Sequence, residues 1–247
     1  MSSLKRLLLL SVFLPFLACF TNFAVSQEAI DPELAEKLEK VGRVIKTVQP
    51  MLQGQSAPVY VEGKDYERLE QPVPVRDPAK IEVVELFWYG CGHCFDFESL
   101  ISAWKPTLAA DVDFWQSPAM WSQDMRVHAR AFYTAEALGA LEKMNGVIFN
   151  AMNVERKPLR NQAEIEALFA SQGIKAEDFA KAYNSFSVAS KVKQADARAR
   201  SYKISGTPEV IVDGKYRVSA KLAGSQPDMI RVINFLIEQE RRARTKP

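Results

Sequence analysis

The stretch WYGCGHCFDFE, residues 88–98, lies between a strongly apolar run and a periodic segment. The run KIEVVELFW, residues 80–88, is nearly continuous in β-branched and aromatic residues, which predicts a strand buried on both faces. The segment FDFESLISAWKP, residues 95–106, predicts a helix, and VDFWQ, residues 112–116, predicts a second buried strand. Strand, helix and strand at this spacing are typical of a parallel βαβ unit.

The remainder of the chain predicts helices and then strands again. Residues 122 to about 203 have a helical pattern almost throughout. The segment PEVIVDGKYRVS, residues 208–219, contains Asp-Gly, a strong signal for a β-hairpin. Residues 227–244 then have the apolar spacing of an amphipathic helix. The order predicts an α/β chain with a βαβ half, a helical block and a ββα half.

The chain begins with the features of a secretory signal peptide. Two basic residues precede an apolar run over residues 7–20, and the small residues of AVSQ, residues 24–27, suit cleavage before Gln27. We therefore expect residues 1–26 to direct export and to be removed. Two alternatives are an uncleaved membrane anchor, for which the run is short, and acylation at Cys19 as in a lipoprotein.

The charges and cysteines of the mature chain limit its functions. The full sequence has 32 Lys and Arg against 30 Asp and Glu, and residues 1–26 contain two of the basic residues and none of the acidic ones. The mature chain is then formally neutral, which argues against nucleic-acid binding. Without Cys19 it keeps only Cys91 and Cys94. In the oxidising compartments that exported proteins enter, cysteines are usually paired.

Residues 27–56 precede these elements as an extension. Asp31-Pro32 is typical of a helix start, and apolar residues follow from Leu34 to Val48 at three- and four-residue spacing. This pattern predicts an amphipathic helix that packs on its own domain. The alternative is a helix that docks on a partner or forms a homodimer.

The C-x-x-C pair is compatible with a zinc site, a structural disulfide or a redox centre. A structural zinc site needs four ligands. Besides Cys91 and Cys94, the mature chain offers only His93, which lies between them, and His128, which is isolated in a helical stretch. A disulfide across two residues closes too short a loop to stabilise the fold much in the loop-entropy model. We therefore expect no metal and a redox-active pair.

The position of the pair predicts different roles for its sulfurs. Cys91 precedes the first turn of the predicted helix, where unpaired N–H groups and the helix dipole stabilise a thiolate. His93 can add a donor or a positive charge. Both effects lower the pKa of Cys91 and make it the better leaving group. Cys94, one turn further in, is expected to be buried, to have the higher pKa and to act as the resolving cysteine.

Glu85 lies inside the apolar strand, six residues before Cys91. Burial of an unpaired carboxylate is unfavourable, so we expect its pKa to be raised. It is then a candidate for passing a proton to or from Cys94. The alternative is that its side chain reaches solvent at a strand edge.

The segments VVELFWYGCGHCFDFE, residues 83–98, and GTPEVIVDGKY, residues 206–216, together with the helical block, resemble the DsbA family of thiol:disulfide oxidoreductases. The resemblance covers about residues 57–247. It implies a thioredoxin fold with a helical domain inserted between its two halves. The implied boundaries are 57–121 for the first half, 122–190 for the inserted domain and 191–247 for the second half.

The resemblance also implies an activity and partners. The chain would be a periplasmic enzyme of a Gram-negative bacterium that donates its Cys91–Cys94 disulfide to newly exported cysteine-containing proteins, with no other cofactor. A DsbB-type membrane protein linked to quinones would re-oxidise it. Glu85 matches the buried acid of the family, and Pro208 matches a cis-proline whose loop lies against the disulfide. The backbone of Thr207 would then pair with an extended substrate.

Three positions depart from the family pattern. The family usually has proline at Gly92, whereas Gly-His is the pair of eukaryotic protein disulfide isomerases. Valine usually occupies the place of Thr207, whose hydroxyl we expect to hydrogen-bond an active-site sulfur. Gln116 stands where a basic residue is often found near the buried acid. The potentials of DsbA and protein disulfide isomerase differ by about 60 mV, or ~3 kcal/mol, which two hydrogen bonds to a thiolate can span.

Two other functions remain open at this point. One is a disulfide isomerase or reductase kept reduced by a DsbD-like partner, since such isomerases are commonly dimers and the helix over residues 27–56 could join two chains. The other is a peptide-binding chaperone that uses the helical block and the Thr207-Pro208 loop, with the disulfide incidental.

Overall fold

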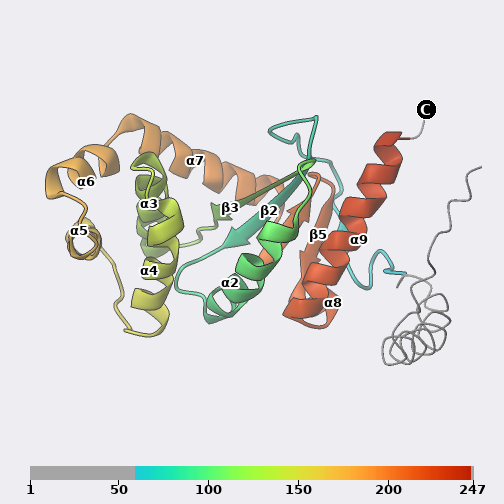
Figure 1. Ribbon diagram of the computed structural model, residues 1–247, viewed down its shortest axis with the longest axis horizontal. Coiled ribbons are helices and arrows are strands. Elements are labelled where there is room, and N and C mark those ends of the chain that lie inside the picture. The colour runs from blue at the N-terminus through green and yellow to red at the C-terminus, as the bar shows by residue number, and fades with distance from the viewer. Residues whose placement is uncertain (1–58, 246–247) are drawn as a thin grey trace, which may run out of the picture. The chain divides into compact units, whose positions relative to one another are not determined.

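A five-stranded mixed sheet lies at the centre of residues 59–245, the part of the chain that this computed structural model describes (Figure 1). The strand order is β1-β5-β4-β2-β3; β2 and β3 run parallel, and the other neighbouring strands run antiparallel. The bounds are β1 Glu67–Arg68, β2 Ile81–Phe87, β3 Val112–Pro118, β4 Glu209–Val212 and β5 Tyr216–Ser219. Every residue of β2 is buried, as its apolar run predicts. The predicted βαβ unit is confirmed.

The prediction of a second buried strand is wrong for β3. It lies at the edge of the sheet, and Val112 to Gln116 are only half-buried. The apolar letters do not distinguish a central strand from an edge strand whose side chains are covered by polar groups. Here the ring of Trp115 packs against the guanidinium groups of Arg76 and Arg198, whose carbons lie 4.7 and 4.4 Å from the ring centre.

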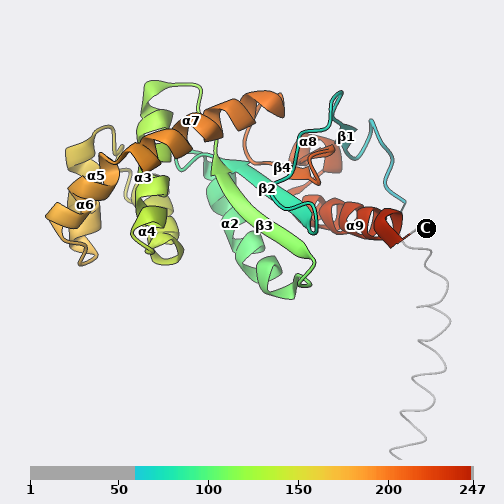
Figure 2. The same ribbon diagram turned by 90° about the horizontal axis from the view of Figure 1, so that it is seen from above.

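Helices cover both faces of the sheet. Figure 2 shows α2 and α9 on one side and α7 on the other. Apolar residues of α2 and α9, among them Phe97, Ile101 and Leu236, pack with Val83 and Val210 of the sheet. The bounds on this side are α2 Gly92–Trp104, the 3₁₀ turn η1 Lys105–Thr107, the short α8 Ala220–Ala223 and α9 Gln226–Thr245.

The predicted helical block contains α3 to α7, and Figure 1 shows α3 to α6 with the first part of α7 at the β3 end of the sheet. It has a hydrophobic core of its own, which also includes Phe87, Tyr89 and Cys94. The expected end of the inserted domain at residue 190 falls inside α7, a continuous helix. The bounds are α3 Gln123–Ala137, α4 Leu141–Asn153, α5 Gln162–Ser171, α6 Ala176–Tyr183 and α7 Phe186–Ser201.

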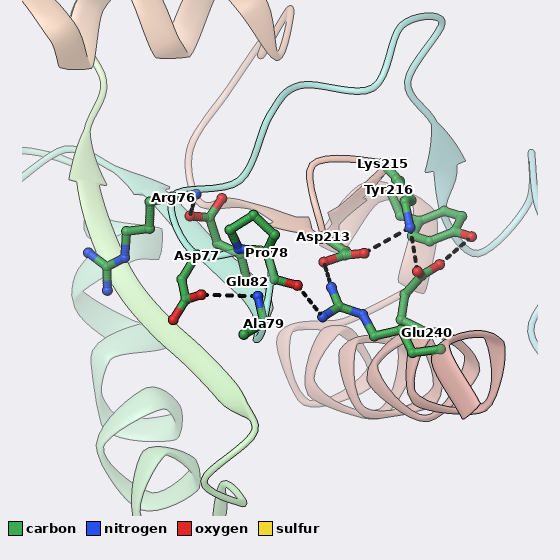
Figure 3. Close-up of polar contacts among 10 residues, drawn as sticks. Arg76, Asp77, Pro78, Ala79, Glu82, Asp213, Lys215, Tyr216 and Glu240 are labelled. Carbon is green, nitrogen blue, oxygen red and sulfur yellow. Dashed lines mark hydrogen bonds and ion pairs between the residues drawn. The ribbon is translucent and has the colours of Figure 1, made fainter. Parts of the chain in front are cut away.

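The predicted hairpin is confirmed, and an ionic cluster surrounds its turn. Asp213 and Gly214 both have positive φ, and a Cβ on Gly214 would lie 2.0 Å from the Val73 carbonyl oxygen, so only glycine fits there. Figure 3 shows Lys215 between Asp213 and Glu240, at 2.8 and 2.5 Å.

The cluster continues into the end of α9. The Tyr216 hydroxyl donates to Glu240 at 2.9 Å, and Arg244 donates to Asp213 at 2.6 Å and to the Pro78 carbonyl at 2.9 Å. Only 5% of Asp213 and 4% of Glu240 is exposed. The hairpin, α9 and the segment that contains Pro78 are therefore joined through charged groups.

Three predictions concern residues outside the described part of the chain. They are the signal peptide over residues 1–26, the acylation alternative at Cys19 and the amphipathic extension over residues 27–56. Within residues 59–245, no helix combines the length and the apolar character that a membrane span requires.

Candidate active site

The cysteine motif forms the junction between β2 and α2. Cys91 is the N-cap of α2, with extended backbone angles (φ −89°, ψ 113°), and its carbonyl accepts from the N–H groups of Cys94 and Phe95 at 3.0 Å. Its sulfur therefore lies at the end of the helix where N–H groups are unpaired and the dipole is positive. Cys91 is half-buried, Cys94 is fully buried, and both are free thiols in this structure.

The environment separates the acidities of the two thiols in the predicted direction. A hydrogen bond from Cys94 to the Cys91 sulfur, helped by Thr207 and by the N–H groups of Cys94 and His93, lowers the pKa of Cys91 to about 5 in spite of partial burial. Burial, followed by the interaction with Cys91, raises the pKa of Cys94 well above its ordinary value. At neutral pH the site therefore holds one thiolate and one thiol.

The loop before β4 brings a distant segment to the cysteines. The Thr207–Pro208 peptide bond is cis. The Cys91 sulfur lies 3.3 Å from the Thr207 carbonyl oxygen, across 116 residues of sequence. A cavity of about 390 Å³ opens beside them, lined by His93 and Lys221 among others. The predicted contact between this loop and the cysteine pair is confirmed.

The two residues between the cysteines are both exposed. A Cβ added at Gly92 would meet nothing within 4 Å, so larger residues fit at this position. The His93 carbonyl accepts from the Gln226 side chain at 2.6 Å, which ties the start of α2 to the start of α9. Gln226 is a part of the site for which the sequence offered no signal.

Glu85 is fully buried in β2, so the alternative of a solvent-exposed side chain is wrong. Its Oε2 accepts from the Gln116 amide at 2.8 Å, and its Oε1 is buried without a hydrogen-bond partner among the described residues. Burial, which outweighs the Gln116 hydrogen bond, raises the pKa of Glu85 to about 8, with smaller contributions from Glu98 and Cys91. The expected shift is confirmed in direction.

Glu98 and Asn145 extend this polar group. The Gln116 amide also donates to Glu98 at 3.0 Å, and Asn145 donates to Glu98 at 3.2 Å and accepts from the Tyr89 hydroxyl at 2.8 Å. Burial raises the pKa of Glu98, against the hydrogen bonds from Gln116 and Asn145. Sequence reasoning missed Glu98, although its place four residues after Cys94 puts it on the same face of the helix.

His128, the other histidine that was weighed as a zinc ligand, lies in a separate environment. Trp88 donates to its Nδ1 at 2.9 Å, and its Nε2 lies 3.0 Å from the Pro158 carbonyl and 3.1 Å from the Leu159 carbonyl. Both ring nitrogens therefore bond within the protein. Burial lowers the pKa of His128 in spite of these carbonyls, which favours a neutral ring with its proton on Nε2.

A thiolate at a helix N-terminus, a buried second thiol and a cis-proline loop on a mixed sheet define a thiol:disulfide oxidoreductase of the thioredoxin type. Residues 101–230 match the model of the DSBA-like thioredoxin domain. The chain belongs to the DsbA family and is an oxidoreductase that carries out thiol:disulfide interchange. The expected fold class, a thioredoxin fold with an inserted helical domain, is confirmed.

The similarity to named relatives extends over most of the chain. It is 40% identical over 187 residues to the thiol:disulfide interchange protein DsbA of Pseudomonas aeruginosa strain PAO1, covering 76% of this chain and 89% of the relative. The DsbA of Azotobacter vinelandii is 43% identical over 181 residues, covering 73% and 85%. The crystal structure of Pseudomonas aeruginosa DsbA aligns with a TM-score of 0.73 at 40% identity, covering 76% of this chain and 97% of that one.

Proposed function

We propose that this protein donates the Cys91–Cys94 disulfide to newly exported proteins in the periplasm. The observation that carries the proposal is that the pKa of Cys91 is lowered while the pKa of Cys94 is raised. A stabilised Cys91 thiolate favours the reduced enzyme and hence transfer of the disulfide to substrate. The relatives in Pseudomonas aeruginosa, Azotobacter vinelandii and Pseudomonas syringae are named DsbA, which favours the oxidase over an isomerase or reductase kept reduced by a DsbD-like partner.

The proposed reaction begins with the disulfide form. A substrate thiolate attacks the Cys91 sulfur, the Cys91–Cys94 bond breaks, and Cys94 leaves as a thiolate that takes up a proton. A second substrate thiolate then attacks the substrate sulfur of the mixed disulfide, and Cys91 leaves as a thiolate. Two electrons pass to the enzyme and one disulfide forms in the substrate, so the reaction as written needs no bound cofactor or metal.

Glu85 is proposed as the group that supplies this proton to Cys94. Its pKa of about 8 means that it holds a proton near neutral pH, and its buried carboxyl is near enough to Cys91 for the charge of that thiolate to contribute to the raised pKa. The Gln116 amide, which bonds both Glu85 and Glu98, holds the carboxyl in place. In re-oxidation the proton would return by the same group.

The partners and the location follow from the family. Unfolded cysteine-containing proteins are the proposed substrates, and a DsbB-type quinone-linked membrane protein is the proposed oxidant of the reduced form. Residues 1–26 are proposed to direct export. A homodimer through residues 27–56 stays a prediction, which the oligomeric state of the mature chain with and without this extension would test.

The redox state of the two cysteines in periplasmic extracts tests the direction of transfer. We expect alkylation of free thiols to find a mainly oxidised pool in wild-type cells, and a mainly reduced pool in cells without the DsbB-type oxidant. A reduced pool in wild-type cells contradicts the oxidase and favours the isomerase or reductase.

The Cys91→Ser variant tests whether the disulfide is incidental. We expect loss of all activity toward a reduced, unfolded protein, since serine forms no mixed disulfide. Undiminished activity of this variant would favour the chaperone. Cys94→Ser is the matched control, because it keeps the Cys91 sulfur but has no disulfide to donate. It should also fail to oxidise the reduced protein. When it is offered a substrate disulfide, its Cys91 thiolate should attack one sulfur, release the other as a thiolate and accumulate as the mixed disulfide.

A further inference from the structure

Glu209, the first residue of β4, holds the loop that faces the cysteines. Only 5% of its surface is exposed. Its Oε1 accepts from the backbone N–H of Ser205 at 3.3 Å, from the Ser205 hydroxyl at 3.2 Å and from the N–H of Gly206 at 3.1 Å. One carboxyl oxygen therefore gathers the three donors of the two residues that precede Thr207.

The second oxygen of Glu209 has a poor environment. Its Oε2 is buried and has no hydrogen-bond partner among residues 59–245. The Nε of Arg217 lies 3.9 Å away. Arg217 itself pairs with Glu67 and donates to the Lys203 carbonyl at 2.6 Å. Burial of a carboxyl with an unmet oxygen is unfavourable, and the three hydrogen bonds to Oε1 offset this cost by fixing the loop.

The loop geometry reaches the reacting sulfur in one further residue. Gly206, bound by Glu209, is followed by Thr207, whose carbonyl oxygen lies 3.3 Å from the Cys91 sulfur. Arg217 fixes the start of the same loop at Lys203. We propose that Glu209 is a positioning residue that holds the Thr207 backbone in register with Cys91, so that an extended polypeptide can pair with the loop while its cysteine attacks.

This inference rests on the proposed function, because it assigns Glu209 to polypeptide substrates. An extended chain that pairs with the Thr207 backbone needs the loop in one position. A small dithiol such as dithiothreitol needs only access to the Cys91 sulfur. Loss of the Glu209 contacts should therefore slow the reaction with a polypeptide and leave the reaction with dithiothreitol unchanged. A general loss of stability would instead change both reactions.

The experiment compares two reactions of the disulfide form of the full mature chain. One is oxidation of a dithiol peptide of about ten residues, measured as kcat/KM, and the other is reduction by dithiothreitol, followed by intrinsic fluorescence. For Glu209→Ala we expect kcat/KM to fall by about tenfold or more, as for a misplaced binding group, while the dithiothreitol rate stays within about twofold of wild type. Glu209→Gln keeps an acceptor oxygen and should restore most of the peptide activity.

Glu82→Ala is the matched control. Glu82 is also buried (2% exposed) and also accepts hydrogen bonds, from Arg76 N–H and the Trp115 ring at 3.1 Å. It lies toward the other end of β2 from Cys91, so its loss should not change the ratio of the two rates. Glu209→Asp keeps the charge but shortens the side chain, and it carries the test if Glu209→Ala does not fold.

The outcomes separate the two proposals. If wild-type protein does not oxidise the peptide, the proposed function is wrong. If wild type is active and Glu209→Ala, or Glu209→Asp in its place, changes both rates equally or neither rate, Glu209 does not position the loop. The inference is also overturned if Glu209→Gln loses as much peptide activity as Glu209→Ala, because the hydrogen bonds would then not be what matters.

Discussion

The turn between β4 and β5 and the active site both bury carboxyl groups, but they shift the pKa of these groups in opposite directions. At the turn, Lys215 bonds Asp213 and Glu240, and Arg244 bonds Asp213 (Figure 3). Burial alone would raise the pKa of Asp213, but the hydrogen bonds and the nearby cations outweigh burial and lower it. Asp213 therefore stays charged and joins the hairpin to Arg244 of α9.

At the active site the carboxyl groups have amides in place of cations. Neither Glu85 nor Glu98 forms an ion pair within the described part of the chain, and the Gln116 amide bonds both. The pKa of each is raised, chiefly by burial. Glu85, whose pKa is about 8, keeps its proton at neutral pH and can give that proton to a leaving thiolate, as a paired carboxylate cannot. The contrast separates buried charge that supports structure from buried acid that is available for chemistry.

The Glu85→Gln variant should produce the largest effect, a change in how the free energy of unfolding depends on pH. Between its ordinary pKa near 4.5 and its folded pKa of about 8, folded Glu85 keeps a proton that the unfolded chain has lost. Stability therefore falls as pH rises through this window, by at most ~1.4 kcal/mol per pH unit. We expect the variant to gain stability over wild type as pH rises from 5 to 8, measured by urea unfolding of both reduced proteins, since the Cys91 thiolate adds the same pH dependence to each.

Asp213→Asn is the control of opposite sign. The lowered pKa of Asp213 gives stability that is present above its ordinary pKa of 3.8 and is lost as pH falls below it. The variant should therefore be less stable than wild type at neutral pH, with a difference that shrinks in acid. If both variants show the same sign of pH dependence, the contrast between the two clusters is wrong.

Lys215→Met should produce the next largest effect, on stability alone. It leaves Asp213 and Glu240 buried with fewer partners, and breaking a buried pair is strongly destabilising. About a third of the Lys215 side chain is exposed. We therefore expect the free energy of unfolding to fall by ~2–3 kcal/mol, which is less than the ~3–5 kcal/mol typical of a broken buried pair. Urea unfolding measures this loss, and an unchanged rate of reaction with dithiothreitol shows that the active site is intact. A loss below ~0.5 kcal/mol would mean that the cluster does not stabilise the fold.

The amino-acid sequence was informative where one strong local pattern decided the structure. Three features were predictable because each depends on neighbouring residues: the nearly continuous apolar run of β2, the helix that begins after Cys91 and the Asp213-Gly214 turn. The direction of the pKa shifts of Cys91 and Glu85 was also predictable. The start of the helix brings Cys94 and backbone N–H groups to the Cys91 sulfur, and burial raises the pKa of Glu85.

Contacts between distant segments were not predictable in the same way. Periodicity did not reveal that β3 is an edge strand, because that depends on the order of strands in the sheet. Nor did it show that Gln226 binds the His93 carbonyl, or that Glu209 holds the residues before Thr207. Each is a single polar side chain whose partner is fixed only once the sheet has formed.

Gln116→Lys places a cation in the active-site cluster and so makes it resemble the turn. An ammonium between Glu85 and Glu98 favours their charged forms, and we expect the pKa of Glu85 to fall by about 1–2 units. NMR titration of the Glu85 carboxyl carbon in the reduced protein measures this shift. Gln116→Met is the control, because it removes the amide without adding charge and should not lower the pKa. If lysine does not lower the pKa of Glu85, its side chain does not reach the cluster, and the missing cation is not what separates the two regions.

Thr207→Val should produce the smallest effect, a small change in redox potential. It tests the hydrogen bond from the uncharged Thr207 hydroxyl to the active-site sulfurs. The Thr207 side chain lowers the pKa of both cysteines. For Cys91, the hydrogen bond from Cys94 lowers the pKa more than the Thr207 side chain does. Without its hydroxyl the Cys91 thiolate is less stable, so the reduced enzyme is less favoured and the protein becomes a weaker oxidant. Loss of one hydrogen bond of ~1 kcal/mol corresponds to about 20 mV, measured as the equilibrium with glutathione.

Thr207→Ser keeps the hydroxyl, and its redox potential should stay near that of wild type. If valine leaves the potential unchanged, or makes the protein more oxidising, the hydroxyl does not stabilise the thiolate and the helix N-terminus with Cys94 accounts for the low pKa of Cys91.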